Sequence, residues 1–135
     1  MTSISTDKNE IKLYYSSESS VGKQTYAYLS ASNKDILAID ITKTNVTGTQ
    51  WKYIAEQLNL SSGDLVNQEH TNFTRKIDKS NEISETDWIK ILNKQPEVLT
   101  YPIAIIGKRY YQIKNPSDVE KYLEANSEGI EPQNP

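Results

Sequence analysis

The segment from residue 11 to residue 41 constrains the fold more than any other part of the chain. Residues 11–16, IKLYYS, begin with alternating apolar and polar side chains, which predicts a strand. Residues 35–41, DILAIDI, form a nearly continuous apolar run that predicts a second, buried strand. Between them, one helical face carries four residues: Val21, Thr25, Tyr28 and Leu29. Strand, helix and strand at this spacing predict a βαβ unit with parallel strands.

The region from about residue 43 to about residue 98 is predicted to be a helical insertion. Its first helix has an apolar face of four residues: Trp51, Ile54, Ala55 and Leu58. Ser61 and Asp64 have the spacing of a capping box, which predicts a short helical turn. We interpret Trp51 and Trp88 as anchors of the core.

A clearer helix start lies near the end of this insertion, in ISETDWIKIL. Ser84 is the predicted N-cap, and Asp87 closes a capping box with it. Ile83 and Trp88 are spaced to form a hydrophobic staple. Pro96 marks the end of the helix.

The C-terminal part predicts two strands and a helix. VLTYPIAII is the third strand, with Pro102 at its start, and Gly107–Lys108 turns into an antiparallel fourth strand, RYYQI. KNPSDVEKYLEA is the last helix, with Asn115 as N-cap, Pro116 at its first position and Asp118 at its third. Its buried face is formed by three residues: Val119, Tyr122 and Leu123.

This element order predicts an α/β fold with a mixed four-stranded sheet, in the order βαβ, helical insertion, ββα. A chain of 135 residues is long enough for one such domain, which we place at residues 11–125. Residues 1–10 are predicted to be flexible, and the polar tail at residues 126–135 to be disordered.

Composition excludes several classes of function. The chain has no cysteine, which removes thiolate catalysis, disulfides and cysteine metal sites, and its one histidine, His70, is interpreted as an exposed loop residue. We therefore expect no metal and no cofactor. The net charge of −3, without a concentrated basic face, argues against direct nucleic-acid binding. The absence of an apolar run predicts a soluble, cytoplasmic protein that does not bind membranes.

Four segments together resemble the arsenate reductase and Spx family of the thioredoxin superfamily. They are IKLYYSSESSVGKQTYAYL, DITKTNVTGTQWKYIAEQLNL, ISETDWIKILNKQPEVLTYPIAI and KNPSDVEKYL, in this order along residues 11–124. The resemblance implies a thioredoxin-like fold. It also implies a cis peptide bond between Tyr101 and Pro102, and we expect a trans bond there, or the lack of a parallel βαβ start, to refute the resemblance.

The resemblance places the reductase active site on residues whose chemistry has changed. Ser19 stands where the family has its cysteine nucleophile, and Lys23 follows as the basic residue of the helix. Tyr101 and Asn115 stand where the family has arginines that bind the oxyanion, and Asn67 loosely matches a third. An alcohol is a much weaker nucleophile than a thiolate, and neutral side chains cannot replace bidentate arginines. We therefore expect a degenerate site without arsenate reductase activity.

The serine loop has a structural and a functional interpretation. Ser19 and Ser20 are expected to cap the following helix. Alternatively, the helix N-terminus and Lys23 still bind an anion. The tyrosines of the strands are expected to alternate between core and surface, although they are also candidates to line a cleft: Tyr14, Tyr15, Tyr101, Tyr110 and Tyr111.

Two kinds of function follow from the resemblance. The first is a non-catalytic binding or regulatory module, a pseudoenzyme with an unknown protein partner, since Spx proteins use this scaffold to bind RNA polymerase. The alternative is a protein that binds glutathione or a small anion and retains a thiol-dependent reductase or transferase activity. The ligand-binding candidates are Tyr15, Ser19, Ser20, Lys23, Tyr101 and Pro102.

Overall fold

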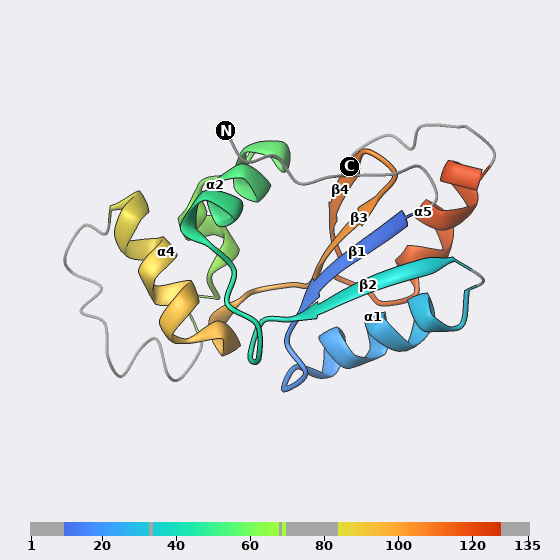
Figure 1. Cartoon of the computed structure of the whole chain (residues 1–135), viewed down its shortest axis with the longest axis horizontal. Coiled ribbons are helices and arrows are strands. Elements are labelled where there is room, and N and C mark those ends of the chain that lie inside the picture. The colour runs from blue at the N-terminus through green and yellow to red at the C-terminus, as the bar shows by residue number, and fades with distance from the viewer. Residues whose placement is uncertain (1–9, 33, 68, 70–83, 128–135) are drawn as a thin grey trace.

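The computed structural model describes residues 10–32, 34–67, 69 and 84–127 (Figure 1). Its centre is a four-stranded sheet in the order β2-β1-β3-β4. The strands are β1 (Glu10–Tyr15), β2 (Asp35–Asp40), β3 (Ile103–Ile106) and β4 (Arg109–Gln112). β1 is parallel to β2 and antiparallel to β3, and β3 is antiparallel to β4. The predicted α/β fold with a mixed sheet is confirmed.

Helices cover both faces of the sheet, as Figure 1 shows. On one face α1 packs against α5, and the insertion lies beyond the other face, where α2 packs against α4. The helices are α1 (Ser20–Ser30), α2 (Gly48–Gln57), α4 (Glu85–Lys94) and α5 (Asp118–Ser127), with short 3-10 turns η1 (Ser62–Leu65) and η2 (Pro96–Val98). No helix in the described ranges is both long and apolar enough to cross a membrane.

Two hydrophobic cores share the sheet, because successive side chains of a strand point to opposite faces. Tyr14 of β1 packs into the core of the insertion, together with Trp51 and Ile54 of α2. Leu13 and Tyr15 of the same strand pack into the other core, with α1 and α5. The indole N–H of Trp51 also donates to Asn93 Oδ1 at 2.9 Å, which ties α2 to α4.

The insertion has most of the predicted caps. Ser84 Oγ accepts a hydrogen bond from Asp87 N at 3.2 Å, and Asp64 Oδ2 accepts one from Ser61 N at 3.0 Å. The predicted apolar face of α2 is confirmed, with Trp51 buried at its centre. The predicted staple of Ile83 on Trp88 lies outside the described residues, as does His70.

The prediction that residues 35–41 form a buried strand is wrong in one respect. β2 lies at the edge of the sheet, and Leu37 is 49% exposed. A run of apolar residues does not distinguish an edge strand from a central strand, because the position of a strand is set by its neighbours. In β2 the side chains of Ile36 and Ala38 face α1 and α5 and are partly buried there. The side chain of Leu37 points to the opposite face of the strand and is exposed.

The buried face of α1 and the start of the third strand also differ from prediction. The buried face of α1 is Gly22, Thr25 and Leu29, and Tyr28 is 38% exposed. The third strand starts only at Ile103, since residues 96–98 form η2.

The last helix also begins later than predicted. α5 starts at Asp118, because Asn115, Pro116 and Ser117 form a turn whose carbonyls accept N–H groups three residues ahead. The predicted buried face of this helix is confirmed, with Val119 fully buried. α5 runs to Ser127, two residues into the tail predicted to be disordered, and the rest of that tail and residues 1–9 lie outside the described residues.

Candidate functional site

Ser19 is the N-cap of α1, as the sequence predicts. Its backbone is extended, with φ −96° and ψ 131°, and its Oγ accepts a hydrogen bond from Gly22 N at 3.1 Å. The preceding turn is closed by a hydrogen bond from Ser19 N to Ser16 O at 3.1 Å. Ser20 is the first helical residue, and its hydroxyl accepts a hydrogen bond from Gln24 Nε2 at 3.0 Å. Both hydroxyls therefore serve the start of the helix.

Gly22 allows the helix to approach this loop closely. A Cβ atom at this position would lie 2.5 Å from Ser16 O, a backbone atom that cannot move without shifting the strand end. Only glycine leaves room for the contact, which holds the first turn of α1 against the end of β1.

Asp40, at the end of β2, holds the other side of the loop. Its Oδ1 accepts hydrogen bonds from Ser17 N at 3.2 Å, from Thr42 N at 3.1 Å and from Thr42 Oγ1 at 2.7 Å. Burial acts to raise the pKa of Asp40, but the hydrogen bonds from Ser17 and Thr42 outweigh it and lower the pKa to about 2. The loop is therefore fixed by a charged acceptor.

A cavity of about 670 Å³ opens beside Ser19. It is lined by Ser16, Glu18, Ser19, Asn67, Glu97, Leu99 and Thr100. The far wall is built by two short stretches that pair with each other: Asn67 N donates to Val98 O at 2.7 Å, and Thr100 N donates to Leu65 O at 2.8 Å. These contacts bring Asn67 next to Ser19, so two of the positions derived from the resemblance do share one cavity.

The charge of this cavity is the opposite of what an oxyanion needs. Glu18 and Glu97 contribute carboxylates, and no lysine, arginine or histidine from the described part of the chain lines it. Sequence reasoning missed both glutamates. Glu18 could have been found from the sequence, because it is adjacent to Ser19. Glu97 could not, because it is brought to the cavity only by the pairing of residues 65–67 with residues 98–100.

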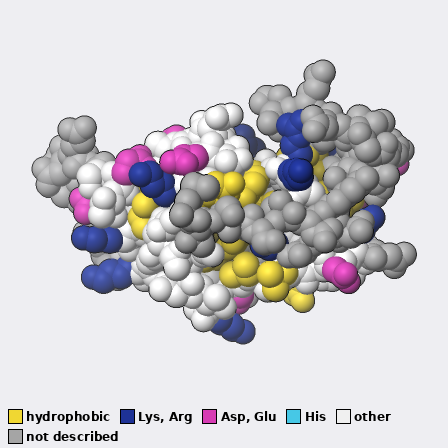
Figure 2. Space-filling model, turned by 45° about the horizontal axis from the view of Figure 1, so that its top comes forward, with side chains coloured by type: hydrophobic (Ala, Val, Ile, Leu, Met, Phe, Trp, Pro, Cys, Tyr) yellow, Lys and Arg dark blue, Asp and Glu magenta, His cyan; other side chains and the backbone are white. Residues whose placement is uncertain are grey.

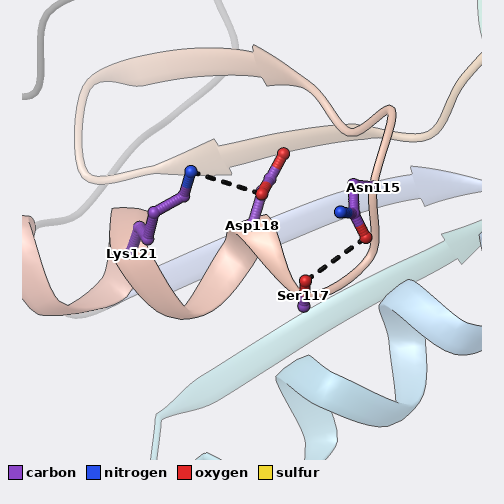
Figure 3. A network of polar contacts seen from close by, with 4 residues as sticks. All are labelled: Asn115, Ser117, Asp118 and Lys121. Carbon is purple, nitrogen blue, oxygen red and sulfur yellow. Dashed lines mark hydrogen bonds and ion pairs between the residues drawn. The ribbon is translucent and has the colours of Figure 1, made fainter.

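The other positions derived from the resemblance do not line this cavity. Lys23 is an exposed residue in the first turns of α1. Tyr101 is half-buried and has the ammonium group of Lys114 5.9 Å from the centre of its ring. Asn115 is exposed, and its Oδ1 accepts a hydrogen bond from Ser117 Oγ at 3.2 Å, next to an ion pair between Lys121 and Asp118 (Figure 3). Lys23, Tyr101 and Asn115 are therefore not among the residues that line this cavity, although Lys23 N donates to Ser19 O at 2.9 Å within the first turn of α1.

The strand tyrosines also do not form a cleft around Ser19. Tyr14 is buried in the core of the insertion, and burial raises its pKa. Tyr15 is buried in the other core, where its ring lies 5.2 Å from the ring of Tyr26, and burial followed by the charge of Asp40 raises its pKa. The expected alternation between core and surface is wrong, because Tyr14, Tyr15, Tyr110 and Tyr111 are all buried. Successive tyrosines instead enter the two cores on opposite faces of the sheet.

The predicted cis bond before Pro102 is wrong. No cis peptide bond occurs in the described residues, so the Tyr101–Pro102 bond is trans. The trans form is the intrinsically favoured one for a bond before proline. Pro102 itself is buried, and its carbonyl accepts a hydrogen bond from Ile113 N at 2.8 Å, just before β3 begins. The trans bond therefore differs from what the resemblance implies, whereas the mixed four-stranded sheet and the helical insertion agree with it.

No protein-family model and no curated protein sequence matches the chain. Solved structures do match. An arsenate reductase of Vibrio cholerae superposes with a TM-score of 0.73 at 15% identity, over 85% of this chain and 98% of that one. An arsenate reductase-related protein of Brucella melitensis gives 0.62 at 15% identity, over 85% and 95%. A protein of Staphylococcus aureus gives 0.62 at 20% identity, over 84% and 98%.

These similarities extend over nearly the whole length of the solved proteins. At identities of 15–20% they establish the fold and leave the chemistry of the site to its own residues. The chain thus has the thioredoxin-like fold of arsenate reductases and of the proteins related to them.

Proposed function

We propose that this chain is a binding or regulatory protein that does not reduce arsenate. One observation carries the proposal: the cavity beside Ser19 is lined by Glu18 and Glu97, and by no basic residue of the described chain. Arsenate is an anion at neutral pH, and proteins recognise such oxyanions through arginine and other charged donors. The carboxylate of Glu18, next to Ser19, opposes the binding of arsenate, because like charges repel at short range.

The side chain at the start of α1 also lacks the required redox chemistry. Arsenate reduction takes two electrons from thiols, and the sulfur atoms are oxidised to a disulfide. A serine hydroxyl has no equivalent oxidation. The Oγ of Ser19 is also already an acceptor for Gly22 N, a contact that stabilises the helix.

A protein partner is the form of binding that we favour. Spx proteins, which the sequence also resembles, use the same scaffold in this way, and we expect a cytoplasmic setting as for them. The alternative of a glutathione or anion site has less support. Of its six candidate residues, only Ser19 lines the cavity, and Pro102 is buried with its carbonyl already accepting a hydrogen bond.

The loss of catalysis can be tested with a coupled assay that supplies glutathione, glutaredoxin and arsenate. We expect no turnover by the wild type, and none by Ser19→Cys, because a restored thiol still faces Glu18 and Glu97. Calorimetric titration with arsenate, phosphate and glutathione should give no binding at millimolar concentration.

The matched control is Ser19→Ala, which removes the hydroxyl and keeps the acidic cavity. Arsenate turnover by the wild type that disappears in Ser19→Ala would overturn the proposal. Phosphate or glutathione binding that Glu18→Gln does not change would also contradict it, since it would show that the carboxylates do not govern the cavity.

A further inference from the structure

The outer edge of β4 is a second surface, where outward backbone groups have no partner strand among the described residues. Ile113 N donates to Pro102 O at 2.8 Å, so the N–H of residue 113 points toward β3. In an antiparallel pair this direction alternates along the strand. The N–H and C=O groups of Tyr110 and Gln112 therefore point away from β3, and no described strand pairs with them.

A cavity of about 330 Å³ lies against this edge. One wall is the end of α2 with the turn that follows it, including Leu58 and Leu60, and another is Tyr122 of α5. Tyr110 and Tyr111 of β4 line it between them, and the rings of Tyr111 and Tyr122 stack with centres 3.9 Å apart. Its volume falls in the range of about 300–1,000 Å³ that is usual for ligand pockets. It can hold a large apolar side chain next to an open strand edge.

The charge at this edge is positive. Lys114 lines the cavity, no carboxylate of the described ranges does so, and exposed Lys108 stands at the other end of β4. Figure 2, in which the top of Figure 1 comes forward, shows hydrophobic side chains on this face of the molecule with Lys or Arg side chains nearby. Such an edge favours a partner that carries negative charge.

Pairing with a second copy of this chain is opposed by the same lysines. An antiparallel β4–β4 pair with full overlap joins the outward groups of Tyr110 to those of Gln112. That register places Lys108 of each strand opposite Lys114 of the other. Like charges directly opposite each other destabilise a strand pair, and edge lysines are a common means of preventing self-association.

We propose that the outer edge of β4 binds an extended acidic segment of a partner protein by strand addition, with one large apolar side chain of that segment in the cavity. Tyr110 and Gln112 supply the main-chain hydrogen bonds, and Lys108 and Lys114 select the charge. The surface differs from the cavity beside Ser19, so the proposal does not depend on the loss of arsenate chemistry. It gives the binding role proposed above a specific partner class.

The test uses a synthetic peptide of alternating glutamate and valine around a central phenylalanine, titrated into the full chain. A second peptide with lysine in place of every glutamate is the charge control. We expect the acidic peptide to bind, to protect the amide protons of Tyr110 and Gln112 from exchange, and to be preferred over the basic one. The charge reversal Lys108→Glu with Lys114→Glu should reverse the preference.

Two proline variants separate the β4 edge from the opposite edge of the sheet. Gln112→Pro removes one outward N–H of β4 and should weaken peptide binding about tenfold, the effect of one lost hydrogen bond. Ala38→Pro removes an outward N–H from β2 and should leave binding unchanged, since Ile41 N donates to Tyr15 O and residues 36, 38 and 40 face outward there. Circular dichroism checks that both variants fold.

Three results would overturn the proposal: equal binding of the two peptides, no binding at millimolar concentration, or protection of Tyr110 and Gln112 in the chain alone. The last result would mean that the edge is already covered, either by this chain or by a second copy. The coupled arsenate assay is independent of all three, so failure of this proposal and failure of the proposed function remain distinguishable.

Discussion

Asp40 shows how a loop can keep its shape after the chemistry associated with it has changed. Ser17 of the serine loop and Thr42, which follows β2, are both bonded to one carboxylate oxygen of Asp40. Hydrogen bonds to an ionised acceptor are stronger than those between neutral groups. The geometry around Ser19 therefore rests on a residue of β2 and not on the position where a nucleophile would stand.

We predict a specific pH dependence for Asp40→Asn. The pKa of Asp40 is lowered in the folded protein from 3.8 to about 2, so its carboxylate stabilises the fold above about pH 4, and the contribution is lost as the pH falls toward 2. Asp40 is partly exposed, so the effect is screened by solvent and should be at most about 1 kcal/mol at neutral pH. Urea denaturation of both proteins between pH 7 and pH 2 measures it.

The wild type should be more stable than Asp40→Asn at neutral pH, and the difference should shrink through the acid range. Asp35→Asn, at the exposed opposite end of β2, controls for the change in net charge. A difference that stays constant down to pH 2 would contradict the role assigned to the carboxylate.

At the scale of elements, the sequence predicted the features that depend on residues close together in the chain. The cap at Ser19, the apolar face around Trp51 and the turn at Ser61 depend on residues within one or two helical turns, and all three are present. The parallel pairing of β1 and β2 also follows from local spacing, because a short helical crossover cannot join antiparallel neighbours in this way.

The parts that could not be predicted depend on contacts between distant segments. β2 is an edge strand because β3 occupies the other side of β1, a fact that the sequence of β2 does not contain. The late start of α5 arises because Pro116 and Ser117 form a turn before the helix. One of the two acidic residues that line the cavity, Glu97, is placed there by the pairing of Val66 with Leu99.

The capping box of α2 gives a prediction for a whole element. Thr47 Oγ1 accepts a hydrogen bond from Gln50 N at 3.1 Å, and Gln50 Oε1 accepts one from Thr47 N at 3.3 Å. Thr47→Ala removes the first of these and should lower the free energy of unfolding by about 1 kcal/mol. Thr49→Ala, inside the same helix and equally exposed, should not lower it, because alanine is the better helix former. Equal losses in both variants would show that the cap contributes nothing specific.

At the scale of the whole molecule, the sheet joins two cores that would otherwise be separate. Tyr14, Ile103 and Ile105 belong to the core of the insertion, whereas their neighbours along the same strands, Leu13 and Ala104, belong to the core with α1 and α5. If these strands separate, the side chains of both cores are exposed together, since the two sets of side chains share one backbone. The insertion is therefore structurally part of the domain, although it interrupts the sequence of the sheet.

We therefore predict that the insertion and the sheet unfold together. Both tryptophans lie in the insertion, so their fluorescence reports on it, while far-ultraviolet circular dichroism reports on the whole chain. The two urea transitions should coincide, as expected for a two-state domain. Ile54→Ala, in the fully buried core of the insertion, should lower the stability by about 2–5 kcal/mol and shift both transitions equally. Leu29→Ala, in the other core, is the matched variant and should also shift both together. A fluorescence transition that precedes the dichroism transition in Ile54→Ala would mean that the insertion unfolds on its own, and that the shared strands do not couple the two cores.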